Sequence, residues 1–161
     1  MLNTAFPKEL RIAGTIQDSI VDGPGIRYVI FTQGCPHHCP GCHNPQTHDF
    51  AGGHIADVEQ ILESIRQNPL LSGVTFSGGE PLMQPEFLSE MLRRLHQAGI
   101  HTCLDTAGAG KGDYEAILAN TDLVLFDVKH EDPDDYHVLT GGDILRPQVF
   151  VEAVRKAGVP M

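Results

Sequence analysis

Residues 26–42 read IRYVIFTQGCPHHCPGC, an apolar run that passes directly into a loop with three cysteines. The run from Ile26 to Thr32 is rich in β-branched and aromatic residues, and it predicts a buried strand. Pro36, Pro40 and Gly41, which follow it, predict an irregular loop. The loop therefore stands at the carboxyl end of a strand, where it presents Cys35, Cys39 and Cys42.

The rest of the chain alternates between apolar strands and helices. Further strands are expected at 73–76, 100–105 and 123–128, and an earlier one near 11–17. Helices are expected at 58–65, 88–95, 114–118 and 150–157, three of them from apolar residues at helical spacing. Near-continuous apolar strands that alternate with amphipathic helices are typical of parallel sheets. The sequence therefore predicts an α/β fold, with a parallel sheet that is either open or curved toward a barrel.

The length of 161 residues indicates a single domain. A closed barrel of eight strand–helix units normally needs ~200 residues or more, so four units cannot close one. The alternation calls for a further strand at 159–161, and without it the strand at 123–128 lies on an open edge, which favours aggregation. A compact open sheet is one alternative. We expect instead that the sequence lacks the C-terminal part of its domain.

The composition is ordinary for a globular protein, with 41% apolar and 20% charged residues. No stretch approaches the ~18–20 apolar residues of a membrane span, and the N-terminus lacks the pattern of a signal peptide. The formal net charge of −10, from 11 basic and 21 acidic residues, argues against nucleic acid as a partner. We therefore expect a cytoplasmic protein with no nucleic-acid and no membrane partner.

The cysteine loop indicates a metal site, because cytoplasmic thiols stay reduced and these three lie close together in the chain. A 4Fe-4S cubane has four irons, so three thiolates leave one iron open to a substrate. The alternative is a Cys3His zinc site with His37, His38 or His43 as its fourth ligand. Such sites usually draw on a second ligand pair, and here only Cys103 remains, alone in a strand, where a cysteine is usually a packing residue.

Polar groups follow three other strands at equivalent places. The sequence Ser77-Gly78-Gly79-Glu80 follows one strand, Asp105-Thr106 closes the next, and Asp127-Val128-Lys129 closes the last. The carboxyl ends of parallel strands meet at one edge of a sheet, so we expect these groups to face the cysteine loop. A turn or a solvated side chain would explain each of them alone. Their common register favours one site, with glycine backbone against a ligand, a lysine for a carboxylate, and aspartates for hydroxyls, an ammonium or a cation.

The cysteine motif resembles that of the radical S-adenosylmethionine superfamily, and Gly78-Gly79-Glu80 resembles its methionine-binding motif. The resemblance implies a 4Fe-4S cluster whose unique iron binds S-adenosylmethionine. The residue before the third cysteine is often aromatic in that superfamily and is a glycine here, as in some activating enzymes. The implied cofactor contacts are Gly41, Cys42, His43, Asn44, Gly78, Gly79, Glu80, Asp105, Thr106, Asp127 and Lys129.

The turn Asp22-Gly23-Pro24-Gly25 with Arg27, together with His43-Asn44, narrows the resemblance to activating enzymes of glycyl radical enzymes. The motifs are nearest to the activases of pyruvate formate-lyase (formate acetyltransferase). Residues 68–81 also resemble the activase of anaerobic ribonucleotide reductase, which stays an alternative beside a non-catalytic zinc module or an inactive fragment. The residues implied to receive the partner's glycine loop are Asp22, Gly23, Pro24, Gly25 and Arg27, and a plain tight turn is the alternative.

This resemblance implies that reduced flavodoxin or ferredoxin supplies one electron, and that a radical from the cofactor removes a hydrogen from one glycine of the partner enzyme. It implies a partial (βα) barrel with about four of roughly six units present and an open edge at the C-terminal side, against eight in a closed barrel. We expect one radical S-adenosylmethionine domain over 1–161 that lacks its C-terminal part, an N-terminal extension with a strand over 1–20, and a cluster-binding loop over 34–50. Catalysis is expected to rest on the cluster and the cofactor alone.

Overall fold

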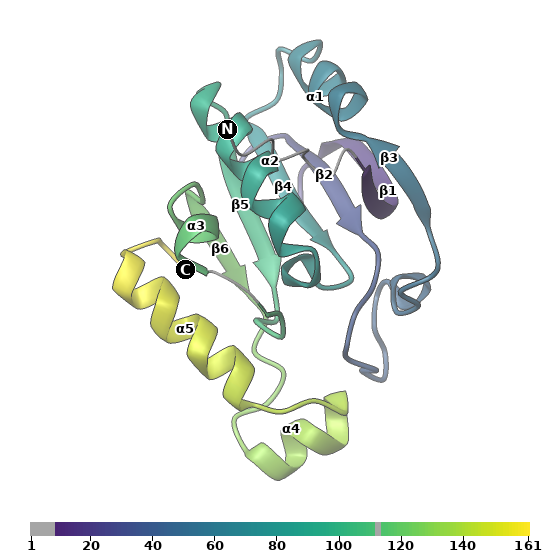
Figure 1. The fold of residues 1–161 in the computed structure, drawn as a ribbon, viewed down its shortest axis with the longest axis vertical. Coiled ribbons are helices and arrows are strands. Elements are labelled where there is room, and N and C mark those ends of the chain that lie inside the picture. Colours follow the sequence, from purple (N-terminus) through teal and green to yellow (C-terminus); the bar gives the residue numbers. More distant parts are fainter. Residues whose placement is uncertain (1–8, 112–113) are drawn as a thin grey trace, which may run out of the picture.

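The computed structural model of the chain describes residues 9–111 and 114–161. Six strands form one sheet in the order β3-β1-β2-β4-β5-β6 (Figure 1). The strands β2, β4, β5 and β6 run parallel, whereas β1 pairs antiparallel with both β2 and β3. Their bounds are Glu9–Ser19 for β1, Arg27–Thr32 for β2, His54–Asp57 for β3, Gly73–Gly78 for β4, His101–Thr106 for β5 and Leu123–Phe126 for β6.

The mixed sheet corrects the prediction of a wholly parallel one. Residues 20–26 are too few for the crossover that parallel neighbours need, so β1 and β2 pair antiparallel. The polar strand β3 was not predicted, because its exposed residues carry no apolar alternation. The other five strands lie where the sequence placed them. The first eight residues of the expected 1–20 segment lie outside the described residues, and the partial barrel stays a prediction.

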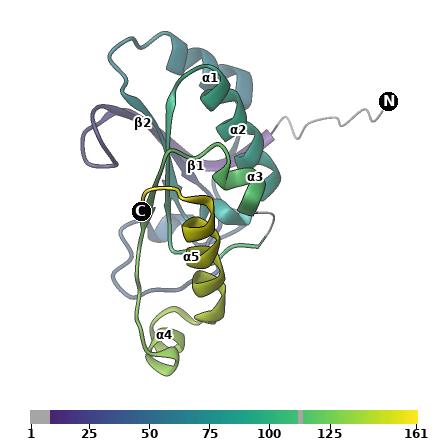
Figure 2. The same cartoon turned by 90° about the vertical axis from the view of Figure 1, so that its left-hand side faces the viewer.

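Four helices cover one face of the sheet (Figure 2), and all four were predicted. Side chains of the strands, among them Ile30, Phe76 and Leu104, form one buried core with Leu92 and Phe150 of the helices. Alternation along each strand places these side chains on the helix-covered face. Among the described residues, no helix is long and apolar enough to cross a membrane. The bounds are Val58–Arg66 for α1, Pro85–Gln97 for α2, Tyr114–Leu118 for α3 and Leu145–Ala157 for α5.

A fifth helix, α4 (Pro133–Thr140), lies beyond the carboxyl ends of the strands and was not predicted (Figure 1). The Asp132 side chain accepts hydrogen bonds from two N–H groups of its first turn, and Pro133 needs no partner at this position. Its buried residues are Tyr136 and Thr140. Two buried positions are too few to give an apolar periodicity that would predict the helix. The Asp132-Pro133 pair, which is typical of a helix start, is visible in the sequence.

The strand β6 lies at one edge of the described sheet. The Val124 N–H donates to the Pro160 carbonyl at 2.9 Å, so the residues after α5 begin to pair with this strand. Only part of the edge predicted for 123–128 is therefore open among the described residues.

Candidate functional site

A cavity of about 380 Å³ lies at the carboxyl ends of β2, β4, β5 and β6. The cysteine loop forms one wall, and the segments that follow the other three strands form the rest. The structure thus brings together residues predicted from four separate stretches of sequence. Those that line the cavity are Cys35, Cys39, Gly41, Cys42, His43, Asn44, Gly78, Gly79, Glu80, Asp105, Thr106, Asp127 and Lys129.

The buried side chain of Gln33 holds the cysteine loop in place. Its Nε2 group donates to the carbonyls of Gln46 at 2.9 Å and Asp49 at 2.6 Å. The next residue, Gly34, donates its N–H to the Thr47 carbonyl at 2.8 Å. Both ends of the loop are therefore tied together, which brings residues 34–50 into one compact unit.

The three thiols of the loop are half-buried. Burial raises the pKa of Cys35 to about 11 and also raises the pKa of Cys39. The Asn44 N–H donates to the Cys42 sulfur at 3.4 Å. Metal ligands are thiolates, so binding of iron here must release protons.

A zinc ion and an iron–sulfur cubane differ in how close together their ligands must lie. Among residues 9–111 and 114–161, no three Cys, His, Asp or Glu side chains are gathered closely enough to hold a single metal ion. Zinc bonds each sulfur at ~2.3 Å, so the ligands of one zinc ion nearly touch. A cubane is larger and takes thiolates at separate corners.

His37, one of the three possible zinc ligands, is 3% exposed and is engaged elsewhere. Its Nε2 atom lies 3.0 Å from the hydroxyl of Tyr136 in α4. Burial, with the positive charges of Lys129 and Arg146, lowers the pKa of His37 to about 4. The imidazole is therefore neutral at pH 7 and serves packing between the loop and α4.

Gly78 and Gly79 let the end of β4 come close to the cysteine loop. Gly78 has a φ of 104°, and a Cβ there would lie 2.5 Å from the Thr32 nitrogen. A Cβ on Gly79 would lie 2.5 Å from the Gly34 carbonyl oxygen. The Gly79 N–H donates to the Thr32 carbonyl at 2.9 Å. At both positions a side chain would collide with the backbone of a neighbouring segment, so only glycine fits. This reason is independent of the predicted approach of a ligand.

The Glu80 carboxylate is 1% exposed and is held within the protein. It accepts hydrogen bonds from the Thr106 hydroxyl at 2.5 Å and from the N–H groups of Leu82 and Ala107, both at 3.1 Å. Burial raises its pKa against the effect of these donors. Glu80 thus ties the end of β4 to the end of β5, and a direct contact with a cofactor stays a prediction.

Three charged residues remain at the ends of β5 and β6. The Ser77 hydroxyl donates to the Asp105 carboxylate at 2.6 Å, and burial raises the pKa of that carboxyl. The Lys129 ammonium pairs with Asp127 at 2.5 Å. Burial acts to lower the pKa of Lys129, but the hydrogen bond and charge of Asp127 outweigh it, so the pKa is raised. Lys129 therefore stays cationic. Ser77 belongs to the strand-end group predicted to face the cysteine loop, but it was not among the implied cofactor contacts.

None of the residues predicted to receive a partner lines this cavity. Arg27 begins β2, at the opposite end of that strand from the cysteine loop, and is fully buried. Its guanidinium donates to the Val74 carbonyl at 2.6 Å and to the Thr75 hydroxyl at 3.0 Å. The Thr75 hydroxyl in turn donates to the Asp22 carbonyl at 2.6 Å. Arg27 thus supports the turn at 22–25 rather than facing a partner directly, and the role of the turn itself stays a prediction.

Comparison with known proteins agrees with the cluster. A family model described as 4Fe-4S single cluster domain matches residues 21–141, most of the chain. The chain belongs to this family. The match includes the cysteine loop, all four parallel strands and α4, so it covers every segment that lines the cavity.

Two relatives of this family member are named pyruvate formate-lyase-activating enzyme. The protein from Clostridium pasteurianum is 50% identical over 145 residues, which cover 87% of this chain and 61% of the relative. The protein from Staphylococcus aureus (strain USA300) is 41% identical over 134 residues, which cover 75% and 53%. The chain thus spans little more than half the length of these relatives. A solved domain of pyruvate-formate lyase-activating enzyme from Bacteroides vulgatus ATCC 8482 is 34% identical, with 56% of each chain covered and a TM-score of 0.49.

Proposed function

We propose that this chain acts in an activating enzyme of pyruvate formate-lyase, which uses a 4Fe-4S cluster and S-adenosylmethionine to generate a glycyl radical on its partner. One observation carries the proposal: three cysteine thiols and the polar groups that end three neighbouring strands line a single cavity. The family match and the names of the relatives support the same function.

The residues of the loop over 34–50 fit a cluster with one open corner. Cys35, Cys39 and Cys42 would hold three irons, and the fourth would face the cavity. When bound, the cluster and S-adenosylmethionine together supply the one-electron chemistry that produces a carbon-centred radical. The protein's part is to fix the loop and to orient the cofactor.

The opposite wall carries groups that match the polar parts of S-adenosylmethionine. The Lys129 ammonium is suited to the methionyl carboxylate. Asp105, oriented by Ser77, and Asp127 are suited to ribose hydroxyls, to the methionyl ammonium or to a cation. A Cβ on Gly41 would meet no atom within 4 Å, so the chain leaves open space beside Cys42.

The proposal includes the partners and the complete architecture. A glycyl radical enzyme would be the protein substrate, reduced flavodoxin or ferredoxin the electron donor, and the cytoplasm the compartment. The helices cover one face of the sheet (Figure 2), which leaves the other face free to line the inside of a partial (βα) barrel. The turn at 22–25 folds toward that second face through its contact with Thr75, and there it would help to receive the partner's glycine loop.

Anaerobic reconstitution with iron and sulfide tests the cluster. We expect a brown protein with about four irons per chain, and an electron paramagnetic resonance signal of the reduced form that changes when S-adenosylmethionine is added. Cys39→Ser should lose most of the iron. Cys103→Ser is the matched control, because Cys103 is buried inside β5, and it should keep the iron. A colourless chain that binds one zinc ion would contradict the proposal.

The activity is tested by mixing the reduced, reconstituted chain with S-adenosylmethionine and pyruvate formate-lyase. We expect the 161-residue chain alone to cleave S-adenosylmethionine weakly, since it spans 61% of the Clostridium relative. Lys129→Ala should weaken the binding of S-adenosylmethionine, measured from the spectral change, without loss of iron. Unchanged binding in this variant would remove Lys129 from the proposed site.

A further inference from the structure

Helix α4 packs on the part of the loop between the first two cysteines, although the two are far apart in sequence. The Tyr136 hydroxyl and the His37 Nε2 atom are 3.0 Å apart and are separated by 99 residues. Their rings meet edge to face with centroids 5.6 Å apart. The next residue, His38, donates its N–H to the Thr140 carbonyl at 3.0 Å. The loop is therefore bound to α4 through His37 and His38.

The His37 ring has little room to move. His37, Tyr136 and Thr140 are each 3% exposed or less. Beyond α4, a Cβ on Gly142 would come within 2.9 Å of the His37 Nε2 atom. The Gly142 N–H donates to the Thr140 hydroxyl at 3.0 Å, which holds the turn after α4 against the ring. The ring is thus confined between Tyr136 and this turn.

The backbone of His37 reaches the first cysteine. His37 lies two residues after Cys35, and its backbone acts to lower the pKa of that thiol against the stronger effect of burial, which raises it. A backbone N–H aimed at sulfur stabilises negative charge there. In iron–sulfur proteins, hydrogen bonds to the ligating sulfurs are among the features that set the reduction potential.

We propose that Tyr136 is a positioning residue that sets the reduction potential of the cluster, by holding His37 so that its backbone N–H stays against the Cys35 sulfur. Tyr136 acts through His37 and the loop, so it needs no contact with the cluster. The inference rests on the proposed cluster. It adds that α4, which follows the strand ending near Asp127 and Lys129, adjusts how readily the site accepts its electron.

Tyr136→Phe tests this inference with little change in packing, because it removes the hydroxyl and keeps the ring. Tyr114→Phe is the matched control: it removes a tyrosine hydroxyl that donates to the Gly110 carbonyl at 2.9 Å, away from the cysteine loop. The measurement is the midpoint potential of the reconstituted cluster, from a redox titration followed by electron paramagnetic resonance. We expect similar iron content in all three proteins and a more negative potential for Tyr136→Phe alone.

A second variant covers the case in which Tyr136→Phe does not fold. Gly142→Ala introduces a methyl group against the Nε2 edge of the His37 ring, and it too should shift the potential. Equal potentials in the unaltered chain and in the folded variants would overturn the role of Tyr136 while leaving the cluster in place. Failure of the unaltered chain to take up iron would overturn the proposed function, and this inference with it.

Discussion

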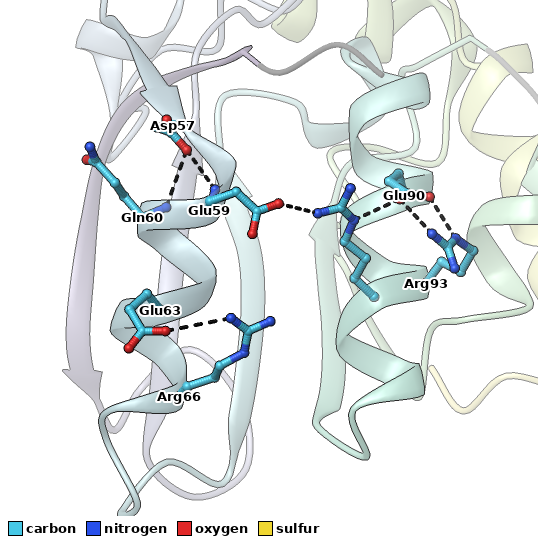
Figure 3. A network of polar contacts seen from close by, with 8 residues as sticks. Asp57, Glu59, Gln60, Glu63, Arg66, Glu90 and Arg93 are labelled. Atoms are coloured by element: carbon cyan, nitrogen blue, oxygen red, sulfur yellow. Dashed lines mark hydrogen bonds and ion pairs between the residues drawn. The ribbon is translucent and has the colours of Figure 1, made fainter. Parts of the chain in front are cut away.

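Glu80 and Glu59 are carboxylates in opposite surroundings. Glu80 is buried at the ends of β4 and β5, and its oxygens accept hydrogen bonds from a hydroxyl and three backbone N–H groups. Glu59 lies on the surface of α1, where Arg94 of α2 bridges it to Glu90 (Figure 3). Both networks join neighbouring elements of the fold. They differ in whether water can replace a lost hydrogen bond, because water reaches the network of Glu59 and does not reach that of Glu80.

This difference predicts where the chain tolerates change. Removal of a buried acceptor leaves its donors without partners, and each such donor costs free energy. Removal of an exposed ion pair exposes charges that water solvates almost as well. We therefore expect the strand ends around the cavity to be sensitive to substitution, and the surface between α1 and α2 to be tolerant.

The largest effect is expected for Glu80→Ala. The change leaves the Thr106 hydroxyl and the N–H groups of Leu82, Ala107 and Ala109 without their acceptor. We expect the free energy of unfolding of the metal-free chain to fall by about 3 kcal/mol or more. Urea denaturation followed by circular dichroism measures it. A loss below about 1 kcal/mol would show that water replaces the carboxylate, contrary to the comparison.

The role of Glu80 shows what the sequence could not reveal. Its place beside Gly78 and Gly79 at a strand end is a local pattern, so its position at the edge of the cavity could be predicted from the sequence. Its hydrogen bond to Thr106 joins two strand ends across the sheet, and no local pattern encodes such a pair. The same limit applies to Tyr136, whose partner His37 lies 99 residues away.

The fold was likewise predictable where local sequence patterns encode it, and not where contacts between distant segments do. Five strands and four helices follow apolar patterns that their own residues carry. The strand β3 and the helix α4 were missed because they are mostly exposed, and tertiary contacts rather than apolar periodicity fix them. The antiparallel pairing of β1 follows from the length of its connection to β2, a feature that a focus on strand–helix alternation overlooked.

His37 gives the second prediction, a dependence of stability on pH. Its pKa is lowered to about 4 in the folded chain, so between pH 6.5 and 4 the unfolded state binds the extra proton. The contribution is fully present above pH 6.5 and is lost as the pH falls toward 4, by about 3 kcal/mol in total. Denaturation of the metal-free chain over this range, compared with His37→Gln, isolates the effect.

Other groups also titrate in this range, so the control matters. His54→Gln, which removes an exposed histidine of β3 by the same substitution, is the control. If His37→Gln keeps the slope of the unaltered chain between pH 6.5 and 4, the ring is not held neutral by burial. The expected difference between buried and exposed groups would then not hold at the contact between α4 and the cysteine loop.

A smaller loss is expected at the start of α4. Asp132 is exposed, yet it accepts hydrogen bonds from the N–H groups of Asp134 and Asp135 at 2.9 and 3.1 Å. Asp132→Ala should reduce the free energy of unfolding by about 1 kcal/mol, the usual contribution of such a cap. Glu131→Ala, at the exposed preceding residue, is the control. Equal stability of the two variants would show that α4 is held by its buried face alone.

The smallest effect is expected for Glu59→Gln, which weakens the exposed network. The side chains of Arg94 and Glu59 are 32% and 68% exposed, so the free energy of unfolding should change by less than about 0.5 kcal/mol. Glu90→Gln is the informative partner, because Glu90 is 13% exposed and accepts from both Arg93 and Arg94. Its loss should be larger and should shrink as salt is added. If Glu59→Gln instead lowers the free energy of unfolding as much as Glu80→Ala does, burial does not decide how much each network stabilises the fold. The ion pairs between α1 and α2 would then be required for stability.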